Sequence, residues 1–151
     1  MRFIRIELFL FLLGFASFVC CRKDNQPTQP ITITLWDKPL FEIQSYITGN
    51  WKMQYSIGGI SVHKEIEKNN SYMLLKPDHI VIGNDPVGIV VDTSIVWVKT
   101  DIGTNEFTYL LSYSWSGYLW PEHYVVEQIK NDTLVIREYV DDGFRLYYTK
   151  Y

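Results

Sequence analysis

The sequence has few of the side chains on which metal and thiol chemistry depends. Its 151 residues include 2 cysteines and 3 histidines. None of His63, His79 and His123 has a partner at the spacing of a His-X-His or His-Glu-X-X-His zinc motif. The cysteines are adjacent, Cys20-Cys21, so they cannot form an unstrained disulfide, and two thiols do not complete a structural zinc site. We therefore predict no metal and no cofactor.

Further absences argue against catalysis and against nucleic-acid binding. Gly58-Gly59 lacks the following helix start and lysine of a phosphate-binding loop. Glu122 and His123 are neighbours on a predicted strand, so their side chains point to opposite faces and make a poor acid–base pair. The formal net charge is -3, which gives no electrostatic reason to bind nucleic acid. We expect a protein that is not an enzyme and has no nucleic-acid partner.

No long stretch follows the helical period, whereas alternation with a period of two is frequent from residue 47 onward. Aromatic residues make up 16% of the chain, and they favour strands because flat side chains pack well on pleated surfaces. In the first of these strands the alternation predicts one face with Trp51, Met53, Tyr55 and Ile57, and the other with Lys52, Gln54 and Ser56. The stretch is therefore interpreted as a half-buried strand.

Short apolar runs separated by turn residues continue to the end of the chain. The strongest turn signal is Asp141-Asp142-Gly143, which predicts a hairpin between two strands. About eight strands are expected after residue 46, which indicates an all-β, antiparallel fold. An up-and-down β-barrel is favoured over a sandwich because closure leaves no exposed edge. A barrel of about eight strands has an interior that is either filled or holds one small ligand.

The first 20 residues have the organisation of a secretory signal peptide. Arg2 and Arg5 form a positive start, and the apolar run 8–19 is too short to cross a bilayer comfortably. The segment 16–21 that follows resembles a bacterial lipobox, whose cysteine is lipidated. We expect Cys21 to carry the lipid because small Cys20 precedes it, with Cys20 as the alternative. An ordinary cleaved signal with unmodified cysteines is the competing interpretation.

These features divide the chain into a signal peptide (1–20), a flexible tether (21–44) and a barrel domain (45–151). Pro27 and Pro30 lie in the polar first half of the tether. Residues 31–35 alternate and fit either a short edge strand or extended linker, and 40–47 fits a helical turn. The segment 22–25 resembles the start of mature lipoproteins in Bacteroidota. We expect a monomer anchored in the outer membrane by its lipid, on either the periplasmic or the surface face.

Gly49-Asn50-Trp51 resembles the Gly-X-Trp signature of lipocalin-like barrels. The chain is also similar to small lipocalin-like lipoproteins of Bacteroidota over residues 45–151, through the segments 75–81, 129–136 and the strand around Trp97. The resemblance implies that Trp51 plugs the closed end of the barrel under a basic residue of the last strand. Arg145 is the residue predicted to take this role, so Gly49, Trp51 and Arg145 are expected to close the barrel.

Two hypotheses for binding depend on aromatic residues. In the first, the barrel holds a small lipophilic molecule against the inward side chains of Trp97, Tyr109 and Tyr113, which otherwise simply fill the core. In the second, Trp115, Tyr118 and Trp120 form an exposed platform for a glycan or a partner protein, or else fold down over one barrel end. A structural envelope protein with a filled barrel is the third possibility.

Overall fold

The computed structural model describes residues 31–59, 62–67, 70–103, 106–115 and 121–151. In chain order the elements are β1 (Thr32–Thr34), α2 (Leu40–Ile47), β2 (Gly49–Gly58), β3 (His63–Ile66), β4 (Tyr72–Lys76), β5 (His79–Asn84), β6 (Gly88–Ser94), β7 (Val96–Gly103), β8 (Glu106–Tyr113), β9 (Glu122–Lys130), β10 (Thr133–Glu138) and β11 (Arg145–Lys150). Across these ranges, none of the helical structure combines the length and apolar character needed to cross a bilayer.

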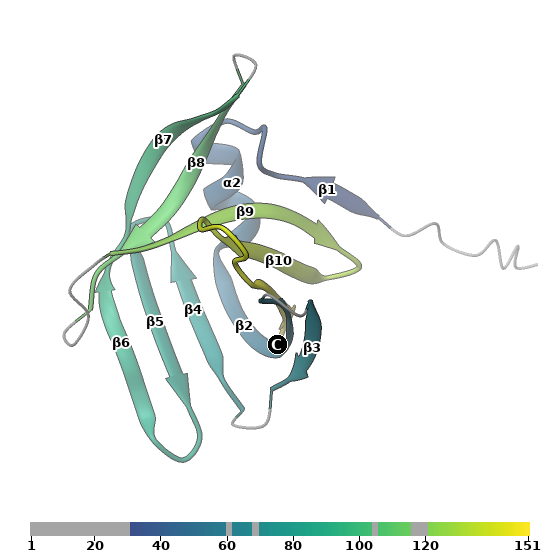
Figure 1. The fold of residues 1–151 in the computed structure, drawn as a ribbon. Coiled ribbons are helices and arrows are strands. Elements are labelled where there is room, and N and C mark those ends of the chain that lie inside the picture. The colour runs from purple at the N-terminus through teal and green to yellow at the C-terminus, as the bar shows by residue number, and fades with distance from the viewer. Residues whose placement is uncertain (1–30, 60–61, 68–69, 104–105, 116–120) are drawn as a thin grey trace, which may run out of the picture.

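All strands belong to one antiparallel, strongly curled sheet (Figure 1), which confirms the predicted all-β class. The main order is β6-β5-β4-β2-β11-β10-β9-β8-β7, with β1 added to β9 and β3 added to β2. β2 pairs with β11, so the first strand of the predicted barrel lies beside the last.

The closed eight-stranded barrel is not confirmed, because β6 and β7 stand at the two ends of the strand order. Only Ile95 separates these two strands. Its N–H donates to the Asp78 carbonyl at 2.8 Å instead of closing a turn between β6 and β7. A one-residue link cannot reverse the chain into a hairpin, so β7 does not return beside β6.

The folded part of the chain begins before the predicted boundary at residue 45. β1 pairs with the end of β9, from Thr32 opposite Lys130 to Thr34 opposite Gln128. The next residue, Leu35, is fully buried. The second half of the segment predicted as flexible tether is therefore part of the domain.

Helix α2 forms where the sequence favours a short amphipathic turn. Pro39 precedes it with a φ already suited to a helix start, and Ile43 and Ile47 are spaced to share one face. Both isoleucines are buried in the core. At the end of the helix, the backbone N–H and the hydroxyl of Thr48 both donate to the Gln44 carbonyl. The helix thus supplies part of the apolar filling of the curled sheet.

The core lies on the inner face of the curl. Its buried members are Leu35, Ile43, Ile47, Trp51, Met73, Leu75, Ile80, Val91, Ile95, Leu111, Tyr113, Tyr124, Val126, Leu134, Ile136 and Tyr148. The opposite side of the sheet is called the outer face below.

Among the residues that the structure describes, four strand pairs shift register, and the bulges in β2 and β9 change which side chains reach the outer face beside Arg145. In β2, Met53 lies opposite Tyr148 and Tyr55 lies opposite Tyr147, so Gln54 is an extra residue. The predicted shared face of Trp51, Met53, Tyr55 and Ile57 is therefore wrong beyond Met53.

The second bulge lies in β9. Val126 is opposite Ile136 and Gln128 is opposite Val135, which makes Glu127 the extra residue. A bulge adds one residue to one strand and so re-aims the side chains around it. Tyr55 and Gln128 face outward as a result, whereas Glu127 is already outward by alternation from Val125.

Candidate functional site

The predicted lining residues of the barrel belong to the packed interior. Tyr113 is buried in the core, and its ring stacks on that of Tyr124 with centroids 5.9 Å apart. Trp97 and Tyr109 are partly buried and pack against the same core, and so does Trp115, which was predicted to belong to the aromatic platform. These side chains do not line either of the two pockets described below.

Other predicted site residues lie outside the described part of the chain. They are Cys20, Cys21, Tyr118 and Trp120. Lipid attachment and the exposed aromatic platform therefore stay predictions.

Trp51 is a central buried side chain, as the Gly-X-Trp resemblance implies. Its side chain also caps the C-terminal end of helix α2. Its indole N–H donates to the Ile47 carbonyl at 2.7 Å. This carbonyl belongs to the last turn of α2. Carbonyls in the last turn of a helix have no backbone N–H partner within the helix. Trp51 is only 1% exposed, so the indole supplies this bond where water cannot.

The cation over Trp51 is Lys150, which corrects the prediction of Arg145. Lys150 lies opposite Trp51 in the β2–β11 register, with its Nζ 5.7 Å from the ring centroid. Arg145 lies opposite Ile57, six positions along β2, or about 20 Å at the usual rise of a strand. Gly49 has a φ of +143°, a conformation that favours glycine, and the Lys150 side chain passes beside it.

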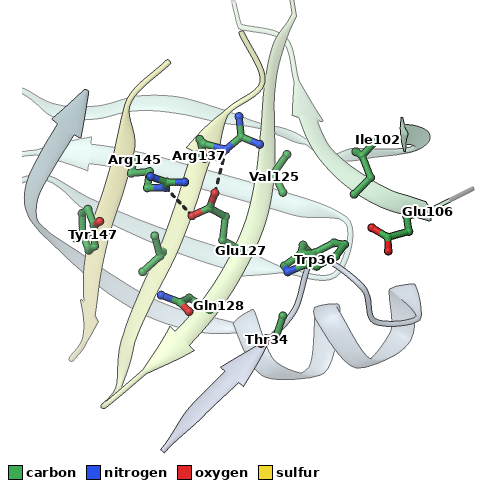
Figure 2. Close-up of a pocket in the computed structure, with 11 residues that line it drawn as sticks. Thr34, Trp36, Ile102, Glu106, Val125, Glu127, Gln128, Arg137, Arg145 and Tyr147 are labelled. Carbon is green, nitrogen blue, oxygen red and sulfur yellow. Dashed lines mark hydrogen bonds and ion pairs between the residues drawn. The ribbon is translucent and has the colours of Figure 1, made fainter. Parts of the chain in front are cut away.

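The outer face carries an open pocket of about 660 Å³, here named the outer pocket (Figure 2). It is lined by Thr34, Trp36, Ile102, Glu106, Val125, Glu127, Gln128, Val135, Arg137, Arg145 and Tyr147. Strands β9, β10 and β11 form one side, and the chain after β1 together with the β7–β8 end forms the other. Apolar Val125 and Val135 are buried, so the pocket combines an apolar base with charged and aromatic walls.

A triad of charged residues, Arg137, Glu127 and Arg145, occupies one end of the outer pocket. Glu127 accepts a hydrogen bond from Arg137 Nε at 2.9 Å on one oxygen and from Arg145 Nε at 2.8 Å on the other. Its side chain is 19% exposed, against 35% for Arg137 and 52% for Arg145. Hydrogen bonding to Glu127 raises the pKa of Arg145.

The triad also lines a second, smaller pocket of about 330 Å³. This pocket lies toward the end of β2 and the β10–β11 turn, and Gly58 and Asp142 contribute to it. The charged triad is therefore shared by two neighbouring hollows of the surface.

An aromatic stack extends the site on the far side of Arg145. The rings of Tyr147 and Tyr55 are 4.4 Å apart at 19°, and Lys64 Nζ lies 3.8 Å from the Tyr55 centroid. Burial raises the pKa of Tyr147, and the neighbouring Tyr55 adds to the effect. Trp36 and Glu106 stand at the opposite end of the outer pocket (Figure 2).

Sequence reasoning missed Glu127 and Arg137 and gave Arg145 a different role. A signal for the arginine pair is present, because Arg137 and Arg145 are equidistant from Asp141 in the predicted hairpin. Pairing around that turn places them opposite each other, as the structure has them. Alternation also places Glu127 on the same face as Val125, but no local pattern gives the β9–β10 register that sets its carboxylate between the arginines.

The described residues contain no group of three or more His, Cys, Asp or Glu side chains placed to hold a metal ion. Comparisons of the chain with protein-family models, with curated proteins and with solved structures find no match.

Proposed function

We propose that this chain is an exported, lipid-anchored binding protein of the cell envelope, and that its small ligand binds in the outer pocket. The proposal assigns it no catalytic role. The pocket volume of about 660 Å³ carries the proposal, since small-molecule sites generally have about 300–1,000 Å³. Apolar Val125 and Val135 beside convergent polar groups fit the same description.

The location of the pocket differs from the barrel interior expected at first. The inner face is filled by side chains such as Trp51 and Leu111, which are each 1% exposed. A ligand in the outer pocket meets both aromatic and charged groups, so an amphipathic molecule fits better than a purely lipophilic one. The lipocalin-like relationship belongs to this proposal as well: the β2–β11 pairing supports it by joining the first strand to the last, while β6 and β7 leave the sheet open.

The anchor part of the proposal rests on the signal and lipobox pattern of residues 1–21. Thr32, where β1 begins, is eleven residues beyond Cys21. An extended chain of that length spans at most about 40 Å, so a lipid on Cys21 keeps the outer pocket near the bilayer. Cys21→Ala is expected to release the protein from the membrane fraction, with Cys20→Ala as the matched control. Retention and acylation of Cys21→Ala would make Cys20 the anchor.

The binding part is tested with the neutral fluorescent probe phenylnaphthylamine and the full chain in detergent micelles. We expect saturable binding that Trp36→Ala weakens by about ten-fold, because Trp36 forms one wall of the pocket. Phe41→Ala is the matched control, since Phe41 is an exposed aromatic residue on α2 outside both pockets. Absence of saturable binding of both this probe and its anionic counterpart, or equal weakening by the two variants, would leave the structural envelope protein as the better interpretation.

A further inference from the structure

Two arginines are held side by side on the outer face with a single carboxylate between them. Arg137 of β10 lies directly opposite Arg145 of β11. Like charges at directly opposed positions of an antiparallel pair are destabilising. Glu127 offsets one of the two positive charges, so the triad carries a formal charge of about +1.

Glu127 does not use all the hydrogen-bond donors of the two arginines. A bidentate arginine–carboxylate pair uses both oxygens of the carboxylate on one guanidinium. Glu127 instead gives one oxygen to each Nε. Neither guanidinium has another hydrogen-bond partner among the residues that the structure describes, and in Figure 2 the terminal nitrogens of Arg137 point away from Glu127.

The ion pairs of the triad add too little stability to explain why two arginines are held together here. Arg145 is about half exposed, and ion pairs at such positions contribute roughly 0–1 kcal/mol. The triad is also the group of residues that both pockets share. An excess positive charge at the meeting point of two hollows suits recognition of a negative ligand group.

We propose that the outer pocket binds an organic anion, with a carboxylate, sulfonate or phosphate group against Arg137 and Arg145 and an attached ring directed toward Trp36. This inference rests on the proposed binding function and adds the chemical class of the ligand. The distribution of charge limits that class further. Glu106 lines the far end of the outer pocket and Asp142 lines the smaller one, so a ligand with its anionic group at one end fits better than a polyanion.

The charge requirement is tested with two probes that share one ring system. Anilinonaphthalene sulfonate carries a sulfonate, whereas phenylnaphthylamine is the neutral counterpart. We expect the full chain in micelles to bind the sulfonate probe about ten-fold more tightly. Arg137→Gln and Arg145→Gln should each remove most of this difference, weakening the sulfonate probe far more than the neutral probe. Lys76→Gln is the charge-matched control, because Lys76 is exposed and lines neither pocket.

Glu127→Gln should change the affinity for the sulfonate probe in the opposite direction. Removing the carboxylate raises the charge of the triad, so the sulfonate probe should bind more tightly by several-fold, and less so at high salt. A triad with a purely structural role would instead lose binding of both probes when any of its members is replaced. Arg145→Lys keeps the charge but loses the forked donor geometry, so partial rescue is expected.

The outcomes separate the two levels of the proposal. If neither probe binds, the binding function itself fails. If both bind equally and the arginine variants change nothing, the outer pocket takes neutral ligands and the anion assignment is overturned. Competition against the bound sulfonate probe then identifies the source of the anion. Displacement by glucuronate but not glucose indicates an acidic sugar, and displacement by benzoate but not benzyl alcohol indicates an aromatic acid.

Discussion

Replacing Trp51 with phenylalanine tests whether the buried indole holds helix α2 onto the sheet. The variant keeps an aromatic ring but removes the N–H that donates to the Ile47 carbonyl at 2.7 Å. A buried acceptor left without a partner costs about 1–3 kcal/mol. The smaller ring also leaves roughly 40 Å³ unfilled, which costs about 1 kcal/mol at about 24 cal/mol per Å³. We therefore expect a loss of about 2–4 kcal/mol in the free energy of unfolding.

Trp97→Phe is the matched control for this substitution. The Trp97 indole also donates to a backbone carbonyl, that of Pro77 at 2.8 Å, but the side chain is only partly buried. Water can replace the lost donor there, so the expected loss is about 1 kcal/mol or less. Urea unfolding followed by far-ultraviolet circular dichroism measures both variants without relying on tryptophan emission. Equal losses in the two variants would refute the helix-ending role of Trp51.

Three other substitutions probe separate features of the fold. Tyr148 is buried and burial raises its pKa, so around and above about pH 10 the unfolded chain loses a proton that the folded protein keeps. Stability should therefore fall with rising pH, and in urea unfolding Tyr148→Phe should reduce that fall by about 1.4 kcal/mol in total between about pH 9 and about pH 11. Gly58→Ala should lower the free energy of unfolding by about 2–4 kcal/mol, because the new Cβ would lie 2.7 Å from Phe144 Cα. At Gly88 a new Cβ meets nothing within 4 Å, so Gly88→Ala should cost less, and equal thermal shifts would contradict this. Glu127→Gln should lower stability by about 1 kcal/mol at low ionic strength, because its two arginine partners then repel each other. A loss that does not shrink in high salt would show that the effect is not electrostatic.

The strand content of this chain was readable from local patterns. Alternation, short turn signals and the Asp141-Asp142-Gly143 hairpin indicate an antiparallel all-β fold, and the structure confirms it. The pairing of the first and last strands, β2 and β11, was also predicted correctly. Alternation and turns depend on neighbouring residues, whose preferences act over a few positions along the chain, whereas the β2–β11 pairing was predicted from the barrel resemblance.

The candidate site was not predictable in the same way. A bulge moves every following side chain of a strand to the opposite face, and no local pattern marks Gln54 or Glu127 as an extra residue. The partner of Trp51 likewise depends on the β2–β11 register, which selects Lys150 over Arg145.

The sequence by itself determined the all-β class, the β10–β11 hairpin and the importance of Trp51. Tertiary structure decided what surrounds these residues: which strands form the ends of the sheet, where Arg145 lies, and that the carboxylate of Glu127 stands between two arginines. The physical reason is that alternation fixes only relative facing within one strand. Register, bulges and strand ends are set by packing between segments that are far apart in the chain.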